Sequence, residues 1–329
     1  MRRLAASVAG TIFLILISAV ACAIEADCMR AANRASYSSF QSPETERQPE
    51  TTRIAVGFGP QGIAFTPGAV WVAYGNNREY GVARIDFETN RVLARVETGR
   101  WPVGAAAGEG SIWIANRNDN SVTRVSPESN RAIATIAVGK KPLGIEAGEG
   151  SVWTANTGSK SVSRIDPKTN TVVATIEVGK QPSAIAISEG AVWVANFGGH
   201  SVSRIDPKTN AVAATIRLRG NPNTIVARGS DVWAGDQDGT VVRIDAKSNS
   251  IVARTEVVFG LTGMAITGNS LWVADYDHGR LLRIDLGSNA LQGRMEVGKG
   301  PVILGRGTDE TGAVWVSNVS DGAVTKIKF

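Results

Sequence analysis

Two histidines, His200 and His278, are the side chains best suited to general acid or base chemistry near neutral pH. If the protein is an enzyme, we expect His278 and Asp275 to be its catalytic residues. The competing interpretation is that Gly199-His200 and His278-Gly279 are ordinary hairpin-turn residues. Because the two histidines fall in repeats that are not adjacent, we do not expect them to share a site.

Asparagine or aspartate recurs at one position of successive repeats, at the end of a short strand. Such side chains could bind amide groups or a hard cation, and they could equally cap loop backbone. We expect this column to contribute to binding: Asn116, Asn156, Asn196, Asp236, Asp275 and Asn318.

Glu146 interrupts an otherwise apolar column of the same repeats. A carboxylate there is expected either to form a salt bridge or to bind a cation. We therefore consider Glu146, Asp236 and Asp275 as weak candidate ligands for a divalent cation, Mg²⁺ or Ca²⁺, and expect no other cofactor.

Seven of the eight tryptophans share one sequence context and are spaced 42, 40, 40, 40, 39 and 43 residues apart: Trp71, Trp113, Trp153, Trp193, Trp233, Trp272 and Trp315. A period near 40 residues in a chain rich in Val, Ile, Thr and Gly indicates the blades of a β-propeller. We expect the tryptophans to pack between blades. An arginine that also recurs in nearly every repeat is expected to pair with a carboxylate as part of the scaffold.

The unit from 142 to 182 divides at its turn signals into four strands, at 144–147, 151–156, 161–166 and 171–178. The turn Asp166-Pro167-Lys168-Thr169-Asn170 suits a type I turn followed by a residue with positive φ. The sequence therefore predicts an all-β fold, a seven-bladed β-propeller with four antiparallel strands per blade.

The two ends of the repeat region predict how the ring closes. The last repeat stops at Phe329, one outer strand short, whereas residues 53–60 match the outer strand and connector at 135–142 of a complete repeat. We expect residues 53–57 to complete blade seven, because an open ring would expose two sheet edges.

Residues 1–28 are typical of a signal peptide, with two arginines, an apolar centre and Ala19-Val20-Ala21 before Cys22. A lipoprotein signal, with Cys22 lipidated, and a retained membrane anchor are the alternatives. Residues 29–51 are expected to form a flexible polar linker and residues 52–329 the propeller. We expect an exported monomer, periplasmic or extracellular, that meets the membrane only through its N-terminal signal or lipid.

The net charge is +5, but 35 basic and 30 acidic residues are interspersed, so no nucleic-acid partner is expected. In the predicted strand order, loops between second and third strands share a face with the connectors between blades. Basic residues, among them Lys141, lie in the connectors of blades one to four, and acidic residues lie in the loops of blades five to seven. Trp101 is the exposed aromatic expected at this face, where we place the ligand.

The segments VWVAN (192–196) and SVSRIDPKTN (201–210) resemble those of the YVTN-repeat propellers. Pro-x-Gly-Ile followed by Gly-x-(Val/Leu)-Trp resembles the streptogramin (virginiamycin B) lyase-like propellers. The second resemblance implies a Mg²⁺-dependent carbon-oxygen lyase, or a related lactonase, with a histidine after the strand-opening proline and a glutamate ending a second strand. The histidine is not in place, since the positions after the proline are Gln61, Val103, Leu143, Ser183, Asn223, Thr262 and Val302. The glutamate is not in place either, since the second strands of blades two to seven end in asparagine or aspartate.

From these observations we expect a non-catalytic exported propeller that serves as a binding or scaffold module. Its loop-bearing face around the central channel would take a small molecule, a peptide or an envelope protein. The alternative is the streptogramin-type lyase.

Overall fold

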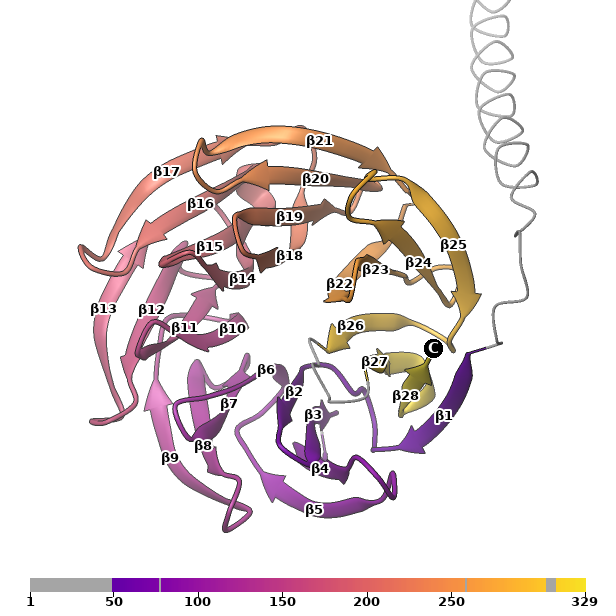
Figure 1. The fold of residues 1–329 in the computed structure, drawn as a ribbon. Helices are drawn as coiled ribbons and strands as arrows, with labels where there is room; N and C mark the ends of the chain where they lie inside the picture. Colours follow the sequence, from indigo (N-terminus) through magenta and orange to yellow (C-terminus); the bar gives the residue numbers. More distant parts are fainter. Residues whose placement is uncertain (1–48, 77, 258, 306–311) are drawn as a thin grey trace, which may run out of the picture. The chain divides into compact units, whose positions relative to one another are not determined.

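The protein is a ring of seven sheets, each of four antiparallel strands, as the sequence predicts (Figure 1). The computed structural model describes residues 49–76, 78–257, 259–305 and 312–329. The predicted signal peptide, with Cys22, and nearly all of the predicted linker lie outside the described residues. Within the described part of the chain, no helix combines the length and the apolar character needed to cross a membrane.

Each blade runs from an inner strand at the channel to an outer strand at the rim. The inner strands are β2 (Ile63–Thr66), β6 (Pro102–Gly108), β10 (Pro142–Gly148), β14 (Pro182–Ser188), β18 (Pro222–Arg228), β22 (Leu261–Thr267) and β26 (Pro301–Gly305). The second strands are β3 (Ala69–Gly75), β7 (Ser111–Asn116), β11 (Ser151–Asn156), β15 (Ala191–Asn196), β19 (Asp231–Asp236), β23 (Ser270–Asp275) and β27 (Val314–Asn318).

The third strands cross the middle of each blade, and the outer strands form the rim. The third strands are β4 (Tyr80–Asp86), β8 (Ser121–Ser126), β12 (Ser161–Asp166), β16 (Ser201–Asp206), β20 (Thr240–Asp245), β24 (Arg280–Asp285) and β28 (Ala323–Lys328). The outer strands are β5 (Val92–Glu97), β9 (Arg131–Ala137), β13 (Thr171–Glu177), β17 (Ala211–Arg217), β21 (Ser250–Glu256), β25 (Leu291–Glu296) and β1 (Glu50–Ala55). Two short 3₁₀ turns, η1 (Phe197–Gly199) and η2 (Val319–Asp321), precede β16 and β28.

The ring closes through the N-terminal strand. The last sheet has the order β1-β28-β27-β26, so the first strand of the described residues is the outer strand of blade seven. Its pairing with β28 runs from Glu50 opposite Lys328 to Ala55 opposite Ala323. The strand therefore begins three residues before the predicted Arg53, inside the segment predicted as linker, and ends two residues before Gly57.

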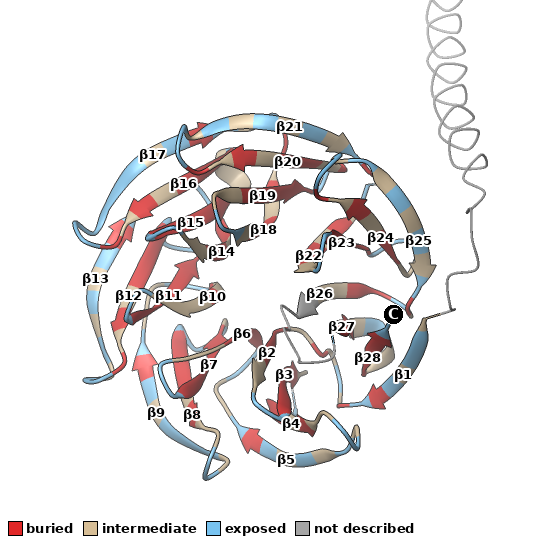
Figure 2. Cartoon of the chain, in the orientation of Figure 1, coloured by how far each residue is buried: buried red, intermediate tan, exposed pale blue. Residues whose placement is uncertain are grey.

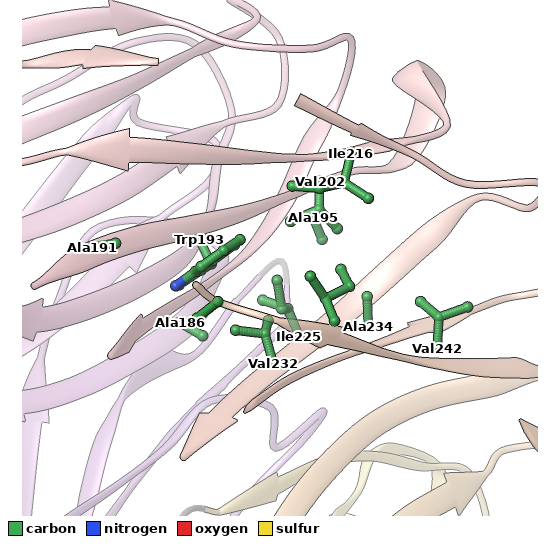
Figure 3. Close-up of a cluster of buried hydrophobic side chains, with 12 residues drawn as sticks. Ala186, Ala191, Trp193, Ala195, Val202, Ile216, Ile225, Val232, Ala234 and Val242 are labelled. Atoms are coloured by element: carbon green, nitrogen blue, oxygen red, sulfur yellow. The ribbon is translucent and has the colours of Figure 1, made fainter. Parts of the chain in front are cut away.

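The recurring tryptophans are packed between blades, as predicted. Figure 3 shows Trp193 of blade four against Ile225 and Val232 of blade five, within one buried cluster. All seven tryptophan side chains of the column are at most 5% exposed. Figure 2 shows the same trend across the molecule, with buried residues concentrated on second strands and exposed ones on the outer strands. The aromatic column therefore belongs to the core and offers no aromatic platform to a ligand.

The recurring arginines join neighbouring blades. Arg164 lies opposite Trp153 across the sheet and its guanidinium carbon is 4.9 Å from the ring centroid. The same guanidinium donates to the carbonyl oxygen of Pro207 at 2.6 Å and to Oδ1 of Asn210 at 2.8 Å, in the turn of the next blade. The predicted carboxylate partner is therefore wrong for this position, whereas Arg243 does pair with Asp231 at 2.7 Å.

The turn asparagines explain why a side-chain acceptor is in reach of Arg84, Arg124 and Arg164. Asn170 and Asn210 have φ of 56° and 54°, which confirms the positive φ predicted for this turn position. Asparagine tolerates this conformation better than most side chains. Its amide oxygen is then directed to the arginine of the preceding blade, as between Asn170 and Arg124 at 2.9 Å.

Candidate functional site

The loops between second and third strands and the connectors between blades lie on one face of the ring, which we call the loop face. Backbone hydrogen bonds join the two sets: Thr157 donates to Lys141 at 3.1 Å in blade three, and Tyr276 donates to Gly260 at 3.2 Å in blade six. The sequence predicted this arrangement. Side chains from a loop and from the preceding connector can therefore meet at one place.

The loop of blade six brings an exposed imidazole onto a buried carboxylate. Nδ1 of His278 lies 2.9 Å from Oδ1 and 3.0 Å from Oδ2 of Asp275. The His278 side chain is 59% exposed, whereas that of Asp275 is fully buried. Nε of Arg280 donates to Oδ2 of the same carboxylate at 2.7 Å. Asp275, His278 and Arg280 form the cluster that we call the blade-six site.

The hydrogen-bond pattern fixes the tautomer of the imidazole. An ionised carboxylate can only accept hydrogen bonds, so Nδ1 of His278 carries the proton. In the neutral form of the ring, the other nitrogen, Nε2, has the lone pair and can take a proton from a bound molecule. A histidine held in this way by a carboxylate is the arrangement of a general base, and the same ring can return the proton as a general acid.

Blade six differs from blade three at the two positions that build this site. In blade three, Asn156 ends the second strand opposite Ser161, and its amide donates to Ser161 at 3.2 Å and to Ser163 at 2.9 Å. In blade six the same opposed pair is Asp275 and Arg280. A neutral amide–hydroxyl cluster is thus replaced by a charged pair that can also orient a histidine.

Two exposed aromatic side chains belong to the blade-six loop and to the connector that this loop contacts. Tyr276 is 41% exposed and precedes His278 in the loop, and Phe259 is 71% exposed in the connector that the loop contacts. A Cβ built on Gly260 would lie 2.6 Å from Oδ2 of Asp277, so connector and loop are in direct contact. These rings offer apolar surface to the part of a ligand that does not react.

The asparagines of the predicted binding column are enclosed within their own blades. Asn116, Asn156, Asn196 and Asn318 are fully buried, and their amide nitrogens donate to hydroxyl groups of the third strand. Glycines of the connectors pack on them, since a Cβ on Gly139 would lie 2.6 Å from the amide carbon of Asn156. These contacts favour the structural alternative, and the structure does not bring the four amides to a common surface.

Asp236 occupies the same column in blade five but has no cationic partner among the described residues. Its side chain lies under Gly220 of the connector and accepts a hydrogen bond from the backbone N–H of Thr240 at 2.9 Å. The position of the second hydroxyl in this blade is taken by Val242. Burial raises the pKa of Asp236 above its ordinary value, and the nearby Asp238 raises it further.

The raised pKa predicts how stability depends on pH. Because the folded-state pKa lies above the unfolded one, the contribution of Asp236 is fully present at low pH and is lost as pH rises through the folded-state value. Asp236→Asn combined with Val242→Thr would recreate the pair of Asn116 and Thr123, which lies at 2.8 Å in blade two. We expect this variant to be more stable than the wild type by about 1 kcal/mol near pH 8, with the gap closing toward about pH 4.

Urea denaturation of both proteins at several pH values measures this difference. The single variant Val242→Thr is the control for the added hydroxyl, since it leaves the carboxyl in place. A stability gap that stays constant between low and high pH would show that ionisation of Asp236 does not cause it.

Trp101 and Lys141 lie on the loop face, as predicted, at equivalent positions of two connectors. Trp101 is 40% exposed, and the two residues have φ of 57° and 53°. The charges around them are partly engaged: Nε of Arg100 is 2.6 Å from Oδ1 of Asp119. The pKa of Asp119 is lowered, chiefly because the backbone N–H of Arg100 donates to it. No ligand role for Trp101 or Lys141 follows from these contacts, so that role stays a prediction.

The three candidate metal ligands do not converge. Glu146 lies on the inner strand of blade three opposite Trp153, whereas Asp236 and Asp275 end second strands of blades five and six. Over residues 49–329, outside the gaps named above, no group of three or more His, Cys, Asp or Glu could hold a metal ion. Binding of Mg²⁺ or Ca²⁺ stays a prediction, and Glu146, Asp236 and Asp275 do not form one cluster that would support it.

His200 has a different environment from His278. Its backbone is left-handed, with φ of 48°, and Nδ1 lies 3.3 Å from the carbonyl oxygen of Gly220. Its ring has a backbone carbonyl as partner where His278 has a carboxylate. The expectation that the two histidines do not share a site fits their places in blades four and six.

Sequence reasoning missed Arg280, Tyr276 and Phe259. One signal was available, because the first residue of the third strand is uncharged in the other six blades: Tyr80, Ser121, Ser161, Ser201, Thr240 and Ala323. In blade six, an arginine at this position lies opposite an aspartate in the asparagine column. Because both residues differ from those usual at these positions and their charges are opposite, they predict an ion pair. The aromatic residues had no comparable signal, since exposure depends on how connector and loop meet.

Fold and site together define a seven-bladed β-propeller with a candidate acid–base site on its loop face. The family model described as "Glutamine cyclotransferase" matches residues 56–238, which is more than half of the chain. The chain therefore belongs to the glutamine cyclotransferase family, an enzyme family. The matched segment includes blades one to four and reaches Asp236 and Asp238 of blade five, while the blade-six site lies beyond it.

Among solved structures, the chain is similar to hydrazine synthase of Kuenenia stuttgartiensis, with a TM-score of 0.75 and 18% sequence identity. The alignment covers 88% of this chain and 99% of that chain. At this identity the likeness shows the propeller fold alone. A comparison with curated proteins finds no match.

The family match corrects the predicted function. The expectation of a non-catalytic binding or scaffold module is wrong, because membership of an enzyme family conflicts with it. The streptogramin-type lyase is not supported either, and neither the YVTN nor the lyase-like resemblance is borne out. Repeat patterns of this kind report how blades pack, and packing is shared by propellers of unrelated function.

Proposed function

We propose that this protein is an enzyme that cyclises a glutaminyl group bearing a free amino group, at the blade-six site. The family description supplies the reaction class. The observation that carries the placement is the exposed imidazole of His278 with its Nδ1 2.9 Å from the buried carboxylate of Asp275. An acid–base pair of this kind is what the reaction needs.

The reaction balances within the substrate. The amino nitrogen forms a bond to the carbonyl carbon of the side-chain amide, closing a five-membered lactam, and the bond from that carbon to the amide nitrogen breaks. The amine loses a proton and the departing nitrogen gains one, so ammonia leaves. One group that takes a proton and returns it is sufficient, and Nε2 of His278 is placed by its tautomer to do both.

The neighbours of His278 have distinct roles in this proposal. Asp275 orients the ring and stabilises it when it is protonated, and Arg280 balances the charge of the buried carboxylate. Tyr276 and Phe259 contact the part of the substrate beyond the glutaminyl group. Because these rings are exposed and apolar, we expect a peptide with an N-terminal glutamine to be a better substrate than free glutamine.

Incubation of the full-length protein with a peptide that begins with glutamine tests the proposal. We expect release of ammonia and, by mass spectrometry, a peptide that has lost one ammonia. The same peptide with an acetylated amino group is the matched control, because it lacks the nucleophile. Turnover of neither peptide nor free glutamine would contradict the proposed reaction.

We also propose that the enzyme acts outside the cytoplasm, on the basis of residues 1–28. Mass spectrometry of the mature N-terminus distinguishes cleavage, lipidation of Cys22 and retention of the segment. An intact, unmodified N-terminus on protein recovered from the cytoplasm would contradict export.

A further inference from the structure

A groove between blades three and four carries positive charge without matching acceptors. It has a volume of about 730 Å³. Blade three lines it with its loop, its outer-strand end and the connector that follows, and blade four lines it with its loop, its third strand and its outer strand. Three of its side chains are the cations Lys160, Lys180 and Arg217, and one is the carboxylate Glu177. His200 also lines it. None of these three cations forms an ion pair with a described residue.

The repeat structure shows which atom is missing from this groove. In blade two the backbone N–H of Arg100 donates to Oδ2 of Asp119 at 2.7 Å, and in blade three that of Lys140 donates to Oγ of Ser159 at 2.7 Å. Blade seven repeats the arrangement, with Lys299 donating to Oδ2 of Asp321 at 2.8 Å. A side-chain oxygen of the loop therefore binds the connector N–H in all three blades.

In blade four, this oxygen is absent because the loop residue is glycine. A Cβ built on Gly199 would lie 2.9 Å from the backbone nitrogen of Lys180, where the other blades carry Asp119 or Ser159. Among the described residues the N–H of Lys180 has no acceptor. An unsatisfied backbone N–H beside lysine and arginine side chains is a place where an anion oxygen is stabilised.

Two buried hydroxyl groups add donors at the same place. Ser201 and Ser203 are 2% and 1% exposed, line the groove, and accept hydrogen bonds from the amide of Asn196. Their own protons have no acceptor among the described residues. Oγ of Ser201 would lie 3.3 Å from a Cβ on Gly199, so the hydroxyl is close to the open N–H.

The end of the outer strand is also changed in blade four. The last residue of this strand is Arg217, whereas it is Glu97, Ala137, Glu177, Glu256 and Glu296 in the other five blades with an outer strand of this kind. The charge reversal and the missing loop oxygen occur together in one blade. Both changes favour a negatively charged ligand.

We propose that this groove binds a small anion through carboxylate or phosphate oxygens, with one oxygen taking the place of the absent loop side chain. The donors are the N–H of Lys180, the hydroxyl of Ser201, and the charged groups of Lys160, Lys180 and Arg217. The site lies in blades three and four, apart from the blade-six site, and it does not depend on the proposed reaction.

Isothermal titration of the full-length protein with inorganic phosphate and, separately, with succinate tests the proposal at a fixed ionic strength set with chloride. Binding of phosphate alone would indicate a phosphate-bearing ligand, and binding of succinate alone would indicate a carboxylate ligand.

Two variants remove the features that define the site. Gly199→Ser restores the oxygen found in blade three. The φ of Gly199 lies outside the positive region, but the serine Cβ would lie 2.9 Å from the backbone nitrogen of Lys180, so the connector must shift slightly to accept it. Arg217→Glu restores the charge found in most blades.

We expect each variant to weaken binding of the better probe by about tenfold or more, the usual effect of losing one charge-assisted hydrogen bond. Arg219→Glu makes the same charge change outside the groove and is expected to alter the affinity by less than about threefold. Melting temperatures confirm that the variants fold. No binding of either probe at millimolar concentration, or equal weakening by Arg217→Glu and Arg219→Glu, would overturn the proposal.

Discussion

Replacing His278 by alanine is expected to lower kcat for cyclisation of a glutamine-initiated peptide by about 10²–10⁴-fold, the usual contribution of a general acid–base group. The physical reason is the loss of the only group that the blade-six site offers for moving a proton between the amine and the departing nitrogen. The side chain is 59% exposed, so its removal should leave the melting temperature almost unchanged. Steady-state release of ammonia measures the effect.

His278→Gln separates proton transfer from hydrogen bonding. Glutamine can still donate a hydrogen bond to Asp275, but it cannot take up a proton at neutral pH. We expect it to be as inactive as the alanine variant. If glutamine restored most of the activity, His278 would be a positioning residue and the proposed base would lie elsewhere.

The double variant Asp275→Asn with Arg280→Ser tests the carboxylate without removing its structural role. It recreates the pair of Asn156 and Ser161, which packs well in blade three with a hydrogen bond of 3.2 Å. We expect the variant to keep its melting temperature, while kcat falls by about 10²-fold or more because the tautomer of His278 is no longer fixed. A variant that folds and retains full kcat would exclude the proposed role of Asp275.

Removal of β1 is expected to have the largest effect on stability. Ile54 and Val56 are 6% and 0% exposed and pack with Trp315 and Val324 of blade seven and residues of blade one. Burying two such side chains contributes about 3–6 kcal/mol, before the backbone pairing with β28 is counted. A chain that begins at Gly57 would lose this contribution and expose β28 as an edge strand, so we expect partial unfolding or aggregation.

A chain that begins at Pro49 keeps β1 and is the matched control for this truncation, with an expected melting temperature equal to that of the full chain. The point variant Ile54→Ala is expected to lower the free energy of unfolding by about 2–4 kcal/mol. Chemical denaturation measures both. If the truncation at Gly57 were as stable as the control, the ring would not depend on its N-terminal strand.

Lys326 makes a second contact that closes the ring. Its Nζ donates to the carbonyl oxygen of Phe87 at 2.6 Å and lies 5.2 Å from the ring centroid of Trp315. It therefore occupies the position of the recurring arginine and joins blade seven to blade one. The two ends of the propeller are thus held by pairing within blade seven and by a contact between blades seven and one.

The strands of the repeats were predictable because their signals are local. In blade three the predicted second and third strands, 151–156 and 161–166, coincide with β11 and β12. Turn residues such as Asn170 predict positive φ, and a repeat period near 40 residues is compatible with few folds. The start of β1 was predicted three residues late, because Glu50, Thr51 and Thr52 are polar and join the strand only through pairing with β28.

The candidate site was only partly predictable. His278 and Asp275 could be chosen from their types, but the sequence did not show that Nδ1 would face the carboxylate or that Arg280 would share it. For the asparagine column, the sequence suggested exposure to a ligand where the structure shows burial. Four amides that recur in register suggested a ligand surface, and they are buried because each supports the connector of its own blade.

The amino-acid sequence by itself determined the number of blades, the strand order within them and the strand that closes the ring, because periodicity and turn chemistry act within about 40 residues. Only the tertiary structure decided which polar residues are accessible. Exposure and partnership arise where a loop of one blade meets the connector from the blade before it. Where the blade-four loop meets its connector, Asn196 is buried while the N–H of Lys180 is left without an acceptor among the described residues. In the blade-six loop, His278 is exposed while Asp275, which orients it, is buried.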